Sequence, residues 1–331
     1  AAILAASGLL PAIPLLGVGG VLSISTTFIP LAGIMFGPVA GTLAAAIGCF
    51  IGQLIAPATA VLGVWSFLIG TVNALVAGLY WERKNWFYVI GLSLLTIVLW
   101  LCLTYPIFTA LTIRRDKPAL DRGISGSWLL AVVATQAVSV SSSLIAARIG
   151  QPFRLELNLL ALSMWLWGGM LYIWMMSLIF YRYAFFRMSP GDLAPPYWIN
   201  MGAMAISTLA GCLLIANAPD APFLTSLLPF LKGFTILYWA TGTWWIPMLL
   251  LLGLWRYVLE RYPFRYDPLY WGVVFPLGMY SACTWQLGRV MELGFLSALS
   301  RTFFWIALAA WSVVFVGMSR SIARMLRRGG R

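Results

Sequence analysis

Long apolar stretches alternate with short polar segments along almost the whole chain. A bilayer core about 30 Å thick requires about 20 apolar residues in each helix that crosses it. Cutting the sequence at its charges and Pro/Gly clusters leaves stretches of this length near residues 1–22, 27–52, 57–81, 86–113, 125–147, 157–181, 198–217, 229–255, 269–288 and 301–324. The first lacks a basic leader, so we interpret it as a spanning helix and not as a signal peptide. The pattern predicts an all-α polytopic membrane protein with about ten transmembrane helices.

Polar residues are distributed unevenly among these predicted spans. The fifth, seventh and ninth spans carry them, whereas the fourth, sixth and tenth are almost entirely apolar. The polar or small residues that we select are Thr135, Gln136, Ser139, Ser142, Asn200, Gly202 and Ser281. Lipid cannot satisfy such groups, so we expect them to face a central path that the three polar helices line. The alternative is that small and hydroxyl residues only allow helices to pack closely.

Composition and charge support the membrane assignment and orient the chain. Of the 331 residues, 62% are hydrophobic and 9% are charged, and the net charge is +12. With ten spans, one side collects fourteen of the 21 basic residues: Arg114, Arg115, Lys117, Arg122, Arg182, Arg187, Arg256, Arg261, Arg265, Arg320, Arg324, Arg327, Arg328 and Arg331. The positive-inside rule places this side, with both termini, in the cytoplasm. We therefore attribute the basic excess to orientation and to the lipid bilayer, and we expect no nucleic-acid partner.

The residue inventory excludes several kinds of chemistry. The chain has no histidine, which removes histidine ligation of haem or zinc, Ser-His-Asp triads and imidazole proton relays. The four cysteines stand singly in apolar runs, and no CxxC spacing occurs. No set of mid-membrane acids, bases and nucleophiles is assembled. We expect neither a cofactor nor a metal, and we do not expect an enzyme.

From about residue 86 the chain resembles the tellurite-resistance/C4-dicarboxylate transporter family, which includes slow anion channels. The stretches that carry the resemblance are ALTIRRDKPALDRGISGSWLLAVVATQAVSV, LAPPYWINMGAMAIS, GTWWIPMLLLLGLWRY and YWGVVFPLGMYSACTWQL. The resemblance implies helical hairpins around a central pore that the odd-numbered helices line. It also implies a cell inner (plasma) membrane location, small anions as substrates and a homo-oligomer, commonly a trimer.

A phenylalanine of the ninth helix plugs the pore in that family. The corresponding pair here is Phe275-Pro276. A proline removes a backbone hydrogen bond and bends its helix, which would push the preceding ring toward the pore axis. An aromatic ring across a narrow apolar pore gates it by excluding water. Without the resemblance, Phe275 would be interpreted as a core or lipid-facing aromatic residue.

Residues 1–85 resemble a different family, the substrate-binding membrane subunits of energy-coupling-factor vitamin transporters. The run FIPLAGIMFGPVAGTLAAAIGCFIGQLIAP contains the GP-x-x-G element of their second helix, and FLIGTVNALVAGLYWER follows it. We therefore predict a three-helix segment over 1–85 and a seven-helix anion-channel-like segment over 86–331.

Three functions follow from these observations. The leading hypothesis is transport of chloride, nitrate or C4-dicarboxylates through a phenylalanine-gated pore. The alternatives are a substrate-binding subunit of an energy-coupling-factor importer and a structural subunit of a larger membrane complex.

Overall fold

The computed structural model describes residues 13–14, 21–22, 43, 86–151 and 153–329. The chain divides into two compact units, Ala1–Arg115 and Asp116–Arg331. Nearly all of the first three predicted spans lies outside the described residues, so those spans stay predictions. In the first of them, β1 (Ile13–Pro14) pairs antiparallel with β2 (Val21–Leu22). These four residues were predicted to be helical, and that prediction is wrong for them. Pro14 and the glycines between the strands disfavour a continuous helix.

The described helix of the first unit is α4 (Trp86–Ile113), which has the bounds predicted for the fourth span. Its apolar window, Leu95–Ile113, has a mean hydropathy of 1.9, and only 6% of that window is buried. A helix that is apolar on all sides and little covered is suited to contact with lipid.

The second unit contains six long helices joined by short turns. Its long helices are α6 (Leu130–Ala146), α7 (Phe153–Phe185), α8 (Ile199–Asn217), α10 (Leu228–Leu254), α11 (Trp271–Val290) and α12 (Leu296–Gly329). Its short elements are α5 (Leu120–Gly123), η3 (Gly126–Leu129), η4 (Pro195–Trp198), η5 (Ala218–Asp220), α9 (Pro222–Ser226), the π-helical turn η6 (Trp255–Leu259) and η7 (Pro268–Tyr270). The order of helices and turns agrees with the prediction for this part of the chain.

Six stretches in the described part of the chain are long and apolar enough to cross a membrane. They correspond to the predicted fourth, fifth, sixth, seventh, eighth and tenth spans. The predicted ninth span is α11, a helix of 20 residues that is not among the six. Glycine, serine, threonine and glutamine residues lower the hydropathy of α11. The helix that carries the predicted gate is therefore less apolar than these six stretches.

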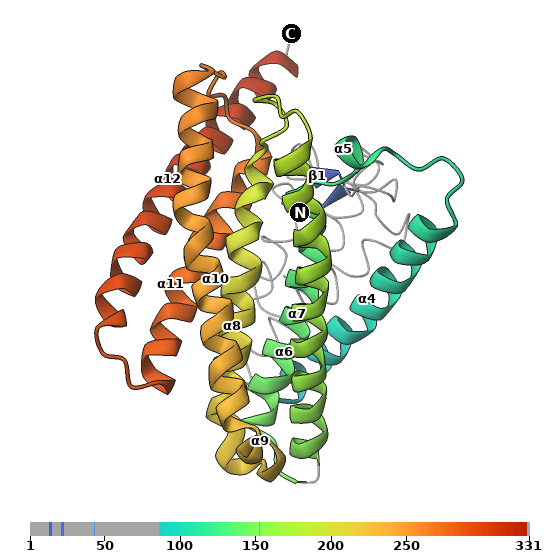
Figure 1. The fold of residues 1–331 in the computed structure, drawn as a ribbon, viewed down its shortest axis with the longest axis vertical. Coiled ribbons are helices and arrows are strands. Elements are labelled where there is room, and N and C mark those ends of the chain that lie inside the picture. Colours follow the sequence, from blue (N-terminus) through green and yellow to red (C-terminus); the bar gives the residue numbers. More distant parts are fainter. Residues whose placement is uncertain (1–12, 15–20, 23–42, 44–85, 152, 330–331) are drawn as a thin grey trace. The chain divides into compact units, whose positions relative to one another are not determined.

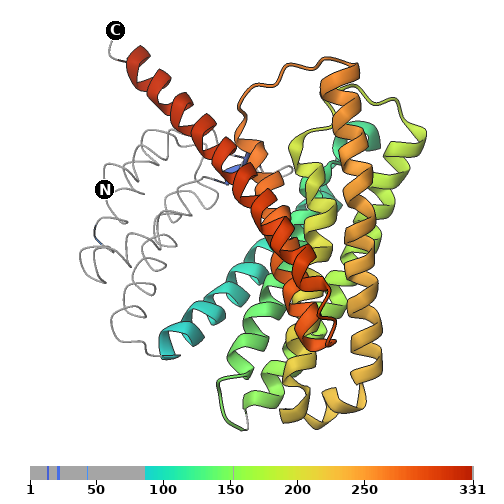
Figure 2. The same cartoon turned by 90° about the vertical axis from the view of Figure 1, so that its left-hand side faces the viewer.

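Helix α8 lies at the centre of the second unit (Figure 1). It contacts α6, α7, α10 and α11, and 83% of its apolar window is buried, against 11% for α12. Helices α6 and α7 pack as one hairpin, and α11 and α12 pack as another. In Figure 2, α12 runs obliquely to α8 and α10. The central position explains why small residues dominate α8, since four neighbouring helices must approach it closely.

A buried tryptophan fixes α7 and α10 against this centre. The Trp165 side chain is fully buried, and its indole Nε1 donates a hydrogen bond of 2.8 Å to the Ser207 carbonyl of α8. Its ring also packs edge-to-face on Tyr238 of α10, with 5.4 Å between the ring centroids. Such a pair adds about 1 kcal/mol to the burial of the rings themselves.

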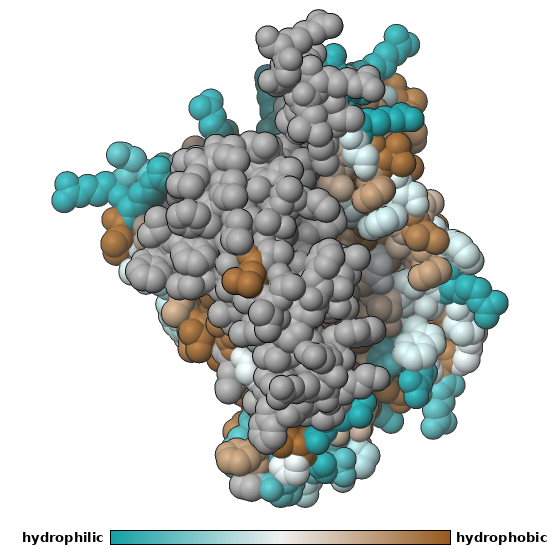
Figure 3. All heavy atoms as spheres, turned by 180° about the vertical axis from the view of Figure 1, so that it is seen from behind, coloured by the Kyte–Doolittle hydropathy of each residue, from teal (hydrophilic) through white to brown (hydrophobic). Residues whose placement is uncertain are grey.

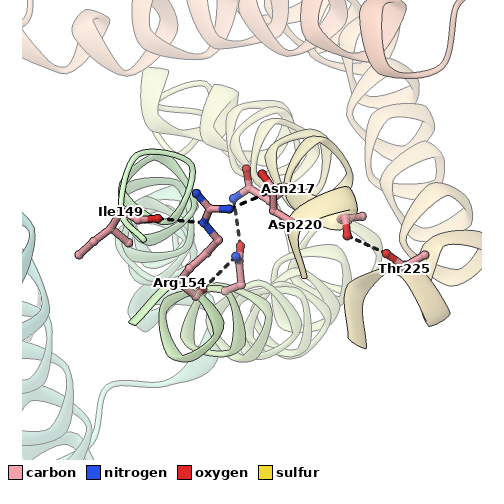
Figure 4. A network of polar contacts seen from close by, with 7 residues as sticks. Ile149, Arg154, Asn217, Asp220 and Thr225 are labelled. Carbon is pink, nitrogen blue, oxygen red and sulfur yellow. Dashed lines mark hydrogen bonds and ion pairs between the residues drawn. The ribbon is translucent and has the colours of Figure 1, made fainter. Parts of the chain in front are cut away.

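A polar network joins the C-terminal ends of α6 and α8 to the start of α7 (Figure 4). Asn217 Nδ2 donates to the Ser143 carbonyl at 2.8 Å and to Asn158 Oδ1 at 2.9 Å. Arg154 donates through Nε to the Ile149 carbonyl, and its Nη1 lies 3.4 Å from Asp220 Oδ1. These bonds satisfy backbone carbonyls that a helix end leaves without intrahelical partners.

The exposed surface of the described helices is largely apolar. Exposed side chains of α7 include Leu159, Met170, Ile173 and Trp174, and α12 adds Trp305 and others. On the face shown in Figure 3, apolar side chains lie interspersed with hydrophilic ones. An exposed apolar surface of this extent is that of a protein surrounded by lipid.

Candidate functional site

Helices α6, α8 and α11 are parallel, so their C-terminal ends lie toward the same end of the second unit. Near the start, a Cβ placed on Gly202 of α8 would lie 2.7 Å from Pro276 Cγ of α11. Near the end, Cys212 of α8 packs with Leu287 of α11. The bond from Asn217 to Ser143 joins the last turns of α8 and α6. These are the three helices that the sequence predicts to line a path.

The structure places the polar residues of α6 against neighbouring helices. Gln136 Nε2 donates to the Trp165 carbonyl at 3.0 Å, and Ser139 Oγ donates to the Ala161 carbonyl at 2.7 Å, both on α7. Thr135 bonds back to the Ala131 carbonyl of its own helix, and Ser142 is 1% exposed. These side chains avoid lipid, as expected, and two of them stabilise the α6–α7 hairpin. Their role in lining a path stays a prediction.

The selected residues of α8 and α11 occupy helix contacts as well. Asn200 is fully buried, and its Nδ2 donates to the Tyr183 hydroxyl at 3.3 Å. Gly202 allows Pro276 to approach α8. Ser281 Oγ donates to the Ser300 carbonyl at 2.8 Å, and Ser300 Oγ returns a bond of 2.9 Å to the Ser281 carbonyl. This reciprocal pair joins α11 to α12.

Phe275 differs from its immediate neighbours in being exposed. Phe275 is 39% exposed, whereas Val274, Pro276 and Leu277 are buried. Gly278, one turn further along α11, has open space where a Cβ would lie. Pro276 therefore packs against α8, whereas Phe275 remains exposed.

Exposed residues follow a single stripe on α11 and another on α6. On α11 they are Phe275, Gly278, Ala282, Trp285 and Arg289, and on α6 they are Ala134, Ala137, Ser141 and Leu144, of which Ala137 and Ser141 are half-buried. Both sets recur at i, i+3, i+7 and i+10, and Arg289 adds i+14 on α11, which is one face of a helix. Leu209, Leu213 and Ala216 are the corresponding less-buried positions of α8. The uncovered faces of these helices thus carry mostly small or apolar residues, and that of α11 ends in an arginine.

Arg182 is a structurally important residue that the sequence reasoning treated only as a basic loop residue. It lies in the last turn of α7, is 6% exposed, and donates to the Ile124 carbonyl at 2.7 Å and to the Tyr197 hydroxyl at 2.8 Å. Its Nη2 also lies 3.1 Å from Asp192 Oδ1. The aromatic run FYRYAFF around it is a signal that could have indicated burial, because charged residues are buried mainly where apolar neighbours and a partner surround them.

Helices long and apolar enough to cross a membrane, with a largely apolar exposed surface, define a polytopic membrane protein. The chain belongs to the voltage-dependent anion channel family (SLAC1), which matches residues 50–319. This confirms the resemblance to slow anion channels, and membership implies anion transport. The match begins at residue 50, so it includes the third predicted span. The resemblance of residues 1–85 to vitamin-transporter subunits concerns residues that are almost all outside the described part, and it stays a prediction, as does the division at residue 85.

Relatives of the chain carry names of membrane proteins and transporters. An uncharacterized membrane protein of Mycobacterium tuberculosis (strain H37Rv) is 38% identical over 161 residues, which cover 49% of this chain and 81% of the relative. An uncharacterized transporter of Methanocaldococcus jannaschii is 24% identical over 262 residues, covering 79% of this chain and 70% of the relative. A second one is 23% identical over 250 residues, covering 76% and 66%. No solved structure matches the chain. These names point to transport and not to enzymatic chemistry.

Proposed function

We propose that the protein conducts small anions, such as chloride, nitrate or C4-dicarboxylates, across the inner (plasma) membrane through a helical pore gated by Phe275. The observation that carries the proposal is the exposure of Phe275 beside a buried proline on an inner helix. Pro276 has no amide N–H and bends its helix, which directs the preceding ring to the uncovered side. An aromatic ring in a narrow apolar pore blocks hydrated ions until it moves.

The lining of this path would be weakly polar. The uncovered faces of α6 and α11 carry Ala134, Ser141, Gly278 and Ala282, and no acidic residue lies on them. Selection would then depend on pore width and on small dipoles more than on fixed charge inside the membrane. Such a path fits several small anions, which is why the proposal names a class and not one substrate.

The gate is tested with Phe275→Ala in planar bilayers or in liposomes loaded with chloride, nitrate or malate. Removing the ring opens the constriction, so we expect a rise in anion conductance of about tenfold or more, since a dewetted barrier of 1.4 kcal/mol corresponds to one factor of ten. Phe304→Ala is the matched control, because Phe304 is 51% exposed on the outer helix α12. Equal conductance in the parent protein and in Phe275→Ala would refute the gating role.

A further inference from the structure

The stripe that begins at Phe275 ends at an arginine. Arg289 is exposed in the last turn of α11, fourteen residues beyond Phe275, and it lies on the same helical face. At 1.5 Å per residue the two positions are roughly 21 Å apart along the helix axis. A path that Phe275 closes near one end of α11 would therefore pass Arg289 near the other end.

The Arg289 side chain is held in place without being neutralised. Its guanidinium carbon lies 4.9 Å from the centroid of the Trp285 ring, one turn earlier on the same stripe. Such a cation–π contact orients the guanidinium and leaves its charge intact. Within the residues that the structure describes, Arg289 makes no ion pair, whereas Arg154 is paired with Asp220 and Arg182 with Asp192. Arg289 therefore presents an oriented positive charge.

A second arginine lies toward the same end of the unit. Arg148 is exposed in the turn after α6, two residues beyond the end of that helix. Because α6, α8 and α11 are parallel, it lies near the same end as Arg289, with the last turn of α8 between their helices. A positive charge at the end of an uncovered face attracts anions to that end.

We propose that Arg289, held over Trp285, attracts anions to the mouth of the path at the end opposite Phe275. This inference rests on the proposed function, since it takes the uncovered stripe of α11 to face the path. It adds a residue that determines anion preference by charge, separate from the ring that opens and closes the path. A positive potential at a pore mouth raises the local anion concentration and lowers that of cations.

The test measures chloride conductance and reversal potential in a KCl gradient for Arg289→Lys, Arg289→Gln and Arg289→Glu, each in the Phe275→Ala background. We expect conductance at about 50 mM salt to fall in that order, by about threefold or more for Arg289→Glu, with the reversal potential moving toward that of potassium. At 1 M salt the Debye length shrinks to about 3 Å, so the differences should largely disappear. Misfolding would not be relieved by salt.

Arg301→Glu is the matched control. Arg301 is exposed in the first turns of α12, just after the turn that joins α11 to α12. Its replacement by glutamate therefore reverses a charge near the same end of the hairpin as Arg289→Glu does. We expect its conductance and reversal potential to match those of the background protein. If Arg289→Glu behaves like Arg301→Glu, Arg289 contacts lipid headgroups and the inference is overturned. If neither the parent protein nor Phe275→Ala conducts anions, the proposed function itself fails.

Discussion

At the scale of single residues, Asp192 couples a surface turn to the buried end of α7. Its Oδ2 accepts hydrogen bonds from the Ser189 hydroxyl at 2.7 Å and the Ser189 amide at 2.8 Å, while Oδ1 faces Arg182. The hydroxyl bond first, then the amide bond and the Arg182 guanidinium, lower the pKa of the Asp192 carboxyl below its ordinary value of 3.8. A carboxyl with a lowered pKa stabilises the fold above its unfolded pKa, and that stabilisation is lost as the pH falls through the folded pKa.

We therefore predict that Asp192→Asn lowers the thermal stability of the protein at pH 7. The Asp192 side chain is 37% exposed, so solvent screens its interaction with Arg182. The loss of unfolding free energy should therefore be less than about 1 kcal/mol. Melting temperatures in detergent, measured from pH 7 downward, should converge with those of the parent protein below pH 3.8. Asp116→Asn, which removes an exposed carboxylate from a loop, should leave the melting temperature unchanged. A pH-independent loss in Asp192→Asn would contradict this account.

The contacts of individual polar residues could be predicted from the sequence only in part. Helical spacing and the cost of unsatisfied groups in lipid indicated that Gln136, Ser139 and Asn200 would avoid lipid, and all three are buried. Their partners could not be predicted from the positions of these residues along the helix. A serine whose hydroxyl donates to the Ala161 carbonyl has the same helical position in the sequence as a serine whose hydroxyl faces a path. Only the register between α6 and α7 distinguishes these possibilities, and that register depends on long-range packing.

At the scale of helices, Gly202 of α8 lies directly against the Pro276 ring of α11. A methyl group on Gly202 would lie 2.7 Å from Cγ and 3.0 Å from Cβ of Pro276. We predict that Gly202→Ala moves α11 away from α8 and lowers the stability by about 1–3 kcal/mol, as overpacking does in other cores. Since Pro276 positions Phe275, the anion conductance should change as well. Thermal melting and bilayer recordings of the same preparation measure the two effects.

Gly253→Ala provides the control for that substitution. Gly253 lies in α10 with nothing within 4 Å of an added Cβ, so alanine should be neutral there or stabilise the helix slightly. If Gly202→Ala and Gly253→Ala have the same melting temperature and the same conductance, α8 and α11 can separate without cost and this prediction is wrong.

The bounds of a helix could be predicted where the length of its apolar stretch determines them. The bounds of α4 agree with the predicted 86–113, and α8 begins one residue after the predicted 198 and ends at the predicted 217. The predictions were short for α7 and α12, which extend to Phe153–Phe185 and Leu296–Gly329. Charged residues such as Arg154, Arg182 and Arg301 marked the expected membrane limits, but a helix continues beyond the bilayer wherever its backbone bonds are satisfied. Hydropathy therefore located the spans better than their ends.

At the scale of the whole molecule, the distribution of arginines predicts the orientation in the membrane. In the second unit, the end that holds Arg182, Arg256 and the C-terminal end of α12 is the more basic one, and the opposite end holds the α11–α12 turn with Glu292. The positive-inside rule counts such residues near the ends of spans, so we predict that the more basic end lies in the cytoplasm. Alternation of consecutive spans would then assign a side to every turn in this unit.

We predict that green fluorescent protein fused after Arg331 fluoresces in cells, and that alkaline phosphatase fused there is inactive, because the cytoplasm allows the first to fold and keeps the cysteines of the second reduced. Fusions after Leu293, in the turn between α11 and α12, should show the reverse pattern. Replacing Arg320, Arg324, Arg327 and Arg328 by glutamine should weaken the asymmetry at the C-terminal site without affecting the turn, since the nearest positive residues contribute most to orientation. Active phosphatase after Arg331 would invert the assignment and place Arg289 on the cytoplasmic side.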